Sequence, residues 1–85
     1  MDKLWAKIMK NHKIISSYTL TLNDDFDANK FFTPLSEICY NLKIETPVIL
    51  NKHIHQMEEY GTTKFSKSDF IDSINFDSLV IEYFQ

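Results

Sequence analysis

Apolar and polar residues alternate along the first quarter of the chain, from Leu4 to Leu22, with a polar interruption at Asn11-His12-Lys13. Alternation of this kind predicts two β-strands, and the interruption predicts the loop of a hairpin. We expect a loop of odd length, because a slip of one residue turns every side chain to the other face and mixes apolar with polar positions. This register places Leu4, Ala6, Ile8, Ile14, Tyr18, Leu20 and Leu22 on one face, and Trp5, Lys7, Met9, Ile15, Ser17 and Thr19 on the other.

The spacing becomes helical after the polar connector 23–27. Phe31, Leu35, Ile38 and Leu42 recur every three or four residues, with Cys39 beside them, which predicts an amphipathic helix. Pro34 lies inside this stretch and has no backbone N–H to donate. Regular helix is therefore expected to begin with Thr33 as N-cap and Pro34 at the first helical position, although the pattern leaves the exact start open.

A second helix is predicted from Pro47 to Tyr60. Thr46-Pro47 repeats the start signal, and Leu50, Ile54 and Met57 form an apolar stripe. Gly61, the one glycine of the chain, follows Tyr60 directly, where a left-handed C-cap favours glycine.

The last third of the chain predicts shorter elements. Residues 63–65 form a short extended piece, Ser66 or Ser68 caps a single turn, and residues 79–84 form a strand. The order β-β-α-α-β predicts an α+β fold with a three-stranded, mainly antiparallel sheet, made of the N-terminal hairpin and the C-terminal strand, packed on two helices. A chain of 85 residues has room for one core, so residues 1–85 are expected to be a single domain.

Charge and cysteine content narrow the classes of function. The chain has no run of more than three apolar residues and one cysteine, which predicts a cytoplasmic protein without a signal peptide, membrane span or disulfide. Residues 1–22 hold four Lys and one Asp, whereas residues 23–85 hold five Lys and eleven acidic residues. All nine basic residues are Lys, and without Arg the commonest guanine contact and the bidentate phosphate clamp are missing.

The residues that could carry metal or catalytic chemistry favour ordinary structural roles. On a helix His53 and His55 lie about 200° apart and cannot meet at one ion, so both are expected on the helix surface. Asn23, Asp25 and Asp27 have calcium-loop spacing, but Ala28 and Pro34 stand where that loop needs Gly and Glu. Cys39 falls on an apolar stripe, which favours an inert core thiol. We expect no metal, no cofactor and no catalytic residues.

Two patterns favour binding. Lys3, Trp5 and Lys7 alternate on one strand face, where they could stack a base or a partner's side chain; the alternative is that another element covers Trp5. The two helices, joined by a predicted three-residue turn near Ile44, have the spacing of a helix-turn-helix, but Glu58 and Glu59 would oppose DNA phosphates. A structural helical hairpin is therefore favoured over a DNA-binding one.

Several strings spread over most of the chain resemble a family of small uncharacterised proteins from clostridial and related low-GC bacteria. The strings are Leu4-Trp5-Ala6-Lys7-Ile8, Glu37-Ile38-Cys39, Pro47-Val48-Ile49-Leu50-Asn51-Lys52-His53, Thr63-Lys64-Phe65, Asp69-Phe70-Ile71 and Phe76-Asp77-Ser78-Leu79-Val80-Ile81-Glu82. The resemblance implies a stand-alone bacterial protein and supplies no activity.

These observations predict a small non-enzymatic interaction or regulatory protein that binds another protein or a second copy of itself. Two helices can cover one side of the predicted sheet, so the other side would keep an apolar patch rimmed by Lys7, Ser17, Thr19 and Glu82. The expected contact residues are Lys3, Trp5, Lys7, Met9, Ile15 and Phe84. The alternative is a nucleic-acid accessory protein that uses the basic hairpin or the helical pair; a membrane partner is not expected.

Overall fold

Local sequence signals and long-range strand pairing together determine the elements of the fold. The computed structural model describes residues 2–85. The elements are β1 (Lys3–Lys10), β2 (Lys13–Thr21), the 3-10 turn η1 (Ala28–Lys30), α1 (Phe32–Leu42), α2 (Asn51–Tyr60), β3 (Thr62–Ser66), the 3-10 turn η2 (Lys67–Asp69) and β4 (Ser78–Phe84). The predicted α+β class is confirmed, with two α-helices and one antiparallel sheet in this part of the chain.

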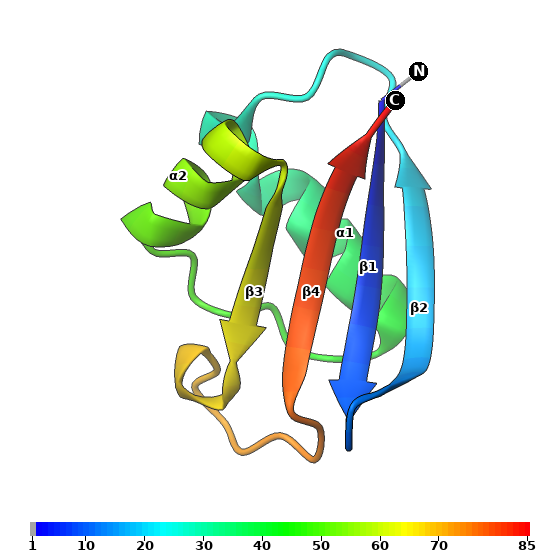
Figure 1. Ribbon diagram of the computed structural model, residues 1–85, viewed down its shortest axis with the longest axis vertical. Helices are drawn as coiled ribbons and strands as arrows, with labels where there is room; N and C mark the ends of the chain where they lie inside the picture. The colour runs from blue at the N-terminus through cyan, green and yellow to red at the C-terminus, as the bar shows by residue number, and fades with distance from the viewer. Residues whose placement is uncertain (1) are drawn as a thin grey trace.

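The sheet has four strands in the described part of the chain, where three were predicted. Its order is β2-β1-β4-β3, and each neighbouring pair is antiparallel (Figure 1). The C-terminal strand joins the hairpin as predicted, and the additional strand β3 pairs with its other edge, with Phe65 opposite Leu79 and Thr63 opposite Ile81. The expected extended piece is therefore part of the sheet, because burial of Thr63 and Phe65 beside β4 completes the core.

The hairpin has the predicted register from Ser16 onward, but a β-bulge and not an odd-length loop produces it. Its loop has two residues, Asn11 and His12, both with positive φ (52° and 64°), as two-residue hairpin turns require. A β-bulge then shifts the pairing, because Met9 faces Ile14 whereas Ile8 faces Ser16. The odd-length loop was wrong, but from Ser16 onward the bulge produces the same alternation. Ile14 consequently lies opposite Met9, away from the core face on which it was predicted.

Helix α1 begins before the predicted cap. Phe31 is the N-cap, so Thr33 and Pro34 are the second and third helical residues. Pro34 costs no hydrogen bond there, because the first backbone N–H groups of a helix have no intrahelical partner. The helix ends at Lys43, whose φ of 61° is left-handed.

Helix α2 begins at Asn51, four residues after the predicted start, and ends as predicted at Gly61 with a φ of 69°. The late start follows from tertiary contacts. The Val48 backbone N–H donates to the Asp69 carbonyl over 2.8 Å, which holds residues before α2 against the segment after β3. The Thr46-Pro47 start signal was therefore wrong, because this segment makes long-range hydrogen bonds instead of helical ones.

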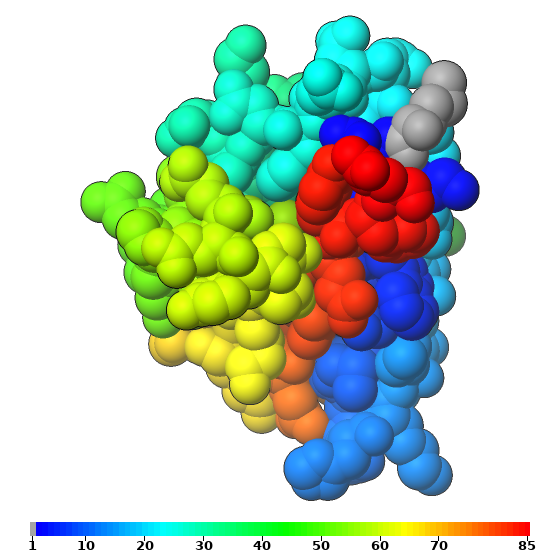
Figure 2. Space-filling view, turned by 45° about the horizontal axis from the view of Figure 1, so that its top comes forward, coloured from blue at the N-terminus to red at the C-terminus, as the bar shows by residue number. Residues whose placement is uncertain are grey.

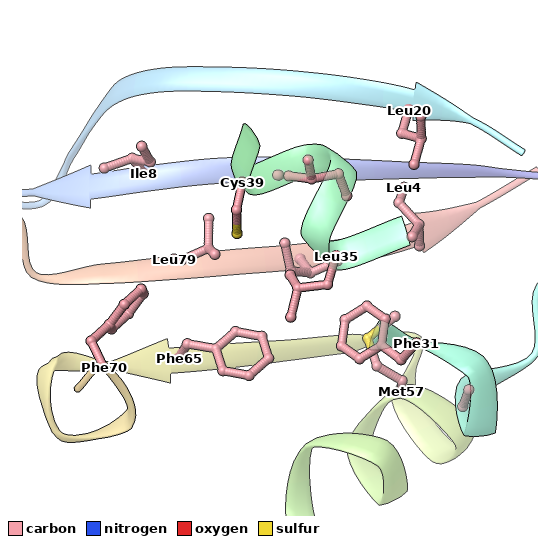
Figure 3. Close-up of a cluster of buried hydrophobic side chains, with 14 of the residues drawn as sticks. Leu4, Ile8, Leu20, Phe31, Leu35, Cys39, Met57, Phe65, Phe70 and Leu79 are labelled. Atoms are coloured by element: carbon pink, nitrogen blue, oxygen red, sulfur yellow. The ribbon is translucent and has the colours of Figure 1, made fainter. Parts of the chain in front are cut away.

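Both helices lie on the same side of the sheet, so the core is a single layer between the sheet and the helices (Figure 1). Figure 3 shows side chains of the strands and of the α1 region pointing toward one another. The fully buried members include Leu4, Phe31, Leu35, Ile38, Cys39, Phe65, Leu79 and Ile81. Each large apolar side chain buried in this way contributes about 1.5–3 kcal/mol. Among the described residues, no helix is long and apolar enough to cross a bilayer.

Candidate functional site

The side of the sheet turned away from the helices has no covering element among the described residues (Figure 1). We call it the open sheet face. Strand pairing assigns to it Lys3, Trp5, Lys7 and Met9 of β1, Ile14, Ser17, Thr19 and Thr21 of β2, Thr62 and Lys64 of β3, and Val80, Glu82 and Phe84 of β4. Figure 1 looks onto this side, with α1 behind the strands. Figure 2 shows the end of β4 (red) against β1 (blue) on the molecular surface.

A cluster of three side chains occupies the middle of the open sheet face. The Lys7 ammonium lies 4.4 Å from the ring centroid of Trp5 and forms an ion pair with Glu82. The pairing of β1 with β4 brings these side chains together. Glu82 lies directly opposite Trp5, and Lys7 is the diagonal neighbour of Glu82 on the same face. The Lys7 side chain is 14% exposed, so its charge is partly shielded from water. Trp5 is half-buried, on the side of the sheet away from the helices.

Apolar side chains extend on both sides of this cluster. Met9 and Val80 are half-buried, Phe84 is 39% exposed and Ile14 is 50% exposed. Of the six contact residues predicted from the sequence, five lie on the open sheet face: Lys3, Trp5, Lys7, Met9 and Phe84. Ile15 is the extra residue of the bulge and falls outside the alternation of β2. It is 55% exposed near the hairpin loop.

The open sheet face is basic although the protein is acidic. It carries Lys3, Lys7 and Lys64 against the single acidic residue Glu82, whereas the whole chain has a net charge of −3. Lys64 enters this set because β3 belongs to the sheet. Sequence reasoning did not include it, because the predicted sheet ended at β4.

The prediction of two surface histidines is wrong for His53, whose side chain is fully buried. Its ring packs on Phe65 with centroids 4.2 Å apart. Its Nδ1 accepts a 2.9 Å hydrogen bond from the Leu50 backbone N–H at the start of α2, so the neutral ring carries its proton on Nε2. The sequence contained a signal for this position, because His53 is four residues before the buried Met57 and shares its side of the helix.

Nε2 of His53 lies near a second buried polar group, without a hydrogen-bond partner among the described residues. Nε2 lies 3.5 Å from Oδ2 of Asp69, which accepts a 2.9 Å hydrogen bond from the Ser66 backbone N–H. Burial lowers the pKa of His53, and the nearby Asp69 carboxylate only partly offsets this. Burial alone would raise the pKa of Asp69, but the Ser66 hydrogen bond and adjacent positive charge keep it below its usual value. The pair connects α2 to the segment after β3.

The remaining residues that the sequence offered as metal ligands or catalytic groups have ordinary structural contacts. Cys39 is buried in the core as predicted, and burial raises the pKa of its thiol to about 11, which leaves it without thiolate near neutral pH. His55 is exposed and lies 2.9 Å from a carboxylate oxygen of Glu59. Asp27 caps η1 by accepting from the Asn29 N–H. No group of three potential metal ligands occurs within residues 2–85.

The predicted three-residue turn between the helices does not form. Residues 43–50 separate α1 from α2, and the helices pack mainly on different strands, α1 on β2 and α2 on β3. The geometry of a helix-turn-helix is therefore missing from this helical pair.

Comparisons with protein-family models, with curated proteins and with solved structures find no match to this chain.

Proposed function

We propose that this chain is a small non-enzymatic protein of the cytoplasm that binds another protein through its open sheet face. The observation that supports the proposal most is the one-sided cover of the sheet. Both helices pack on one side, so Trp5, Met9, Val80 and Phe84 are left on the other. Soluble domains seldom expose a large apolar patch without using it for contact, and aromatic residues are enriched at such contacts.

The charges on this face favour a partner with an acidic and apolar surface. Lys3 and Lys64 flank the apolar residues on β1 and β3, and neither forms an ion pair with another described residue. Their ammonium groups are free to meet carboxylates at the rim of an interface, where charge steers encounter and selects partners. Trp5 and Phe84 would supply the apolar contact.

Single-stranded nucleic acid is the second candidate. The alternation of Lys3, Trp5 and Lys7 on an exposed antiparallel sheet favours it, since stacking aromatics between cations bind such strands without sequence preference. The position of Lys7 argues against it. Its ammonium already lies over the Trp5 ring, and a stacked base would have to displace it and break the ion pair with Glu82.

The proposal is tested by affinity capture with matched variants. Phe84→Ser combined with Lys64→Glu removes an aromatic ring and reverses a charge on the open sheet face. Tyr40→Ser combined with Lys30→Glu makes the same kinds of change at exposed positions elsewhere. Circular dichroism checks that both variants fold. We expect a protein captured by wild type and by the second variant to be lost by the first.

Direct binding separates the partner classes. The captured protein, purified, should bind wild type at least tenfold more tightly than the open-face variant. An equal set of captured proteins on all three baits would contradict the proposal. Binding of a fluorescent single-stranded oligonucleotide that weakens steeply with salt and is lost in Lys3→Gln and Lys7→Gln variants would replace it with the second candidate.

A further inference from the structure

Strand β2 forms one lateral edge of the sheet. It is nine residues long and, within residues 2–85, pairs on one side only, with β1. Figure 1 shows no other segment beside its outer edge. An edge of this length presents a row of backbone donors and acceptors that another strand can pair with.

The hydrogen bond at the end of β2 identifies which of its residues face outward. The Leu22 N–H donates to the Asp2 carbonyl over 2.8 Å. Because residues of an antiparallel strand turn their N–H and C=O groups alternately toward and away from a neighbour, Leu20 and Tyr18 also face β1. The backbone groups of Ser17, Thr19 and Thr21 therefore point outward. Within residues 2–85 no strand pairs with β2 on that side, and these groups take no part in the turn, loop or side-chain hydrogen bonds of this part of the chain.

Most of this edge lacks the features that normally prevent pairing. Natural edge strands are protected by charged residues, proline, bulges, short length or a covering element. In β2 the charge of Lys13 and the bulge at Ile15 lie near the hairpin loop. The following stretch Ser16–Leu22 contains no charged residue, no proline and no glycine.

The opposite edge of the same sheet shows the contrast. Strand β3 has five residues, carries Lys64 at its centre and packs against α2. It is shorter than β2 and has a charge at its centre, whereas helix packing is common to both edges, with α1 on β2 and α2 on β3. The sheet thus has one protected edge and one that is open to another strand.

The charges at the two ends of β2 indicate which strand could pair with its open edge. Lys10, His12 and Lys13 lie at its start, and Asp24, Asp25 and Asp27 follow its end. In an antiparallel pair of two β2 strands, the start of each strand lies beside the end of the other, so lysines meet aspartates at both ends. A parallel pair would bring like charges together. A two-fold axis makes each favourable contact occur twice.

We propose that two copies of this chain pair through their β2 edges into an antiparallel dimer with one continuous eight-stranded sheet. The two-fold axis is perpendicular to the sheet, so both helical layers lie on one side and both open sheet faces lie on the other. The dimer does not depend on the function proposed above, since a monomer could bind a partner through the same face. If that function holds, the dimer presents two adjoining copies of its site.

Sedimentation equilibrium over a range of protein concentrations tests the dimer. Ser17→Lys combined with Thr19→Lys adds two charges at residues whose backbone groups point outward. The new side chains lie on the open sheet face, next to where the second β2 strand would pair, and the backbone pairing with β1 stays intact. Ser73→Lys combined with Asn75→Lys is the matched control, because it adds the same charge at exposed loop positions. We expect concentration-dependent dimers for wild type and the control, and monomers for the edge variant. A wild type that stays monomeric throughout, or an edge variant that dimerises like wild type, overturns the proposal.

Charge reversal tests the antiparallel arrangement. Lys13→Glu should raise the dimer dissociation constant by about three- to tenfold, because each rim pair is a modest contact that occurs twice. Adding Asp24→Lys and Asp25→Lys to Lys13→Glu should restore it. Failure of this rescue would rule out the antiparallel register.

Amide hydrogen exchange provides a measurement on the unmodified protein. The amides of Ser17, Thr19 and Thr21 should become protected as protein concentration rises, while those of Tyr18 and Leu20 are protected from the outset. Equal and constant exchange of the three outward amides at dimeric concentrations would show that the copies meet elsewhere. The capture experiment with Phe84→Ser and Lys64→Glu is independent of this result, so the two proposals fail separately.

Discussion

The two faces of the sheet are built from alternate residues of the same strands, yet they differ in side-chain burial and in whether they contain charged residues. In β1 the covered face has Leu4, Ala6 and Ile8, which are at most 4% exposed. The open face of that strand has Trp5 and Lys7, both half-buried. Packing against the helices excludes charge from the first face. The open sheet face combines aromatic rings with ammonium groups. A buried core would exclude the ammonium groups, and a fully solvated surface would not need the aromatic rings.

This difference distinguishes residues that hold the fold together from residues that are available for contact. On the covered face, each side chain is surrounded by side chains of both layers, so its removal leaves a cavity. On the open face, the contacts are confined to the sheet surface, as in the group of Trp5, Lys7 and Glu82. Substitutions there should affect binding more than folding.

The largest predicted effect is the loss of a ring from the covered face. Phe65→Ala removes a fully buried ring that packs on Phe31 and His53 and should lower the free energy of unfolding by about 3–5 kcal/mol. Phe84→Ala is the matched change on the open face and should cost about 1 kcal/mol or less. Urea unfolding measures both. Equal losses would show that the two faces are equally part of the core.

The next effect is a loss of stability in acid. Lowering the pH should reduce the free energy of unfolding because His53 is buried on the covered side of the sheet. Burial places the pKa of folded His53 below its ordinary value of 6.5, so below that pH the unfolded state takes up a proton more readily than the folded state. The stability contribution of the neutral ring is therefore complete above pH 6.5 and is lost as the pH falls through 6.5 toward the lower folded pKa. Protonation of Nδ1 would also break its bond with the Leu50 N–H.

Unfolding free energies measured between pH 8 and 5 test this effect. His53→Gln keeps an acceptor near Leu50 and removes the titration, so this variant should be less stable at neutral pH and less sensitive to acid. His55→Gln changes an exposed histidine and should retain the pH dependence of wild type. Extending the measurements below pH 3.8 should show a further loss of stability, because the folded pKa of Asp69 is lowered and its carboxylate becomes protonated there. A wild-type slope that persists in His53→Gln would assign the acid sensitivity to another group.

The elements that the sequence predicted correctly have local signals. Alternation from Leu4 to Leu22 indicates the hairpin, and Gly61 marks the end of α2 because a left-handed cap favours glycine. The elements that were missed depend on distant partners. β3 joins the sheet through Phe65 and Leu79, which are far apart in sequence, and the start of α2 depends on the hydrogen bond between Val48 and Asp69.

The same distinction applies to the candidate site. Alternation alone was enough to place Trp5, Lys7 and Met9 on one face. The bulge that removed Ile15 from that face follows from combining a two-residue turn with the burial of Leu20, which a short pattern does not reveal. Lys64 could be included only after β3 was known to belong to the sheet.

The smallest predicted effect tests the central group on the open sheet face. Lys7→Met keeps an apolar side chain of similar length but removes the ammonium that lies over Trp5 and pairs with Glu82. Because an aromatic–cation contact and a partly exposed ion pair are each worth about 0.5–1 kcal/mol, stability should fall by roughly 1 kcal/mol. Acrylamide should quench Trp5 fluorescence more efficiently in the variant, since the ammonium no longer lies over the ring.

A double-mutant cycle with Glu82→Gln separates the ion pair from the contact with the ring. If Lys7 acts through both partners, combining the two substitutions should cost less than the sum of the single ones, while Glu82→Gln alone should leave Trp5 quenching nearly unchanged. Lys64→Met is the control, because its ammonium lies on the same face without an ion pair among the described residues. It should change neither stability nor quenching. A quenching change of equal size in both lysine variants would mean that the Lys7 ammonium gives the Trp5 ring no specific cover.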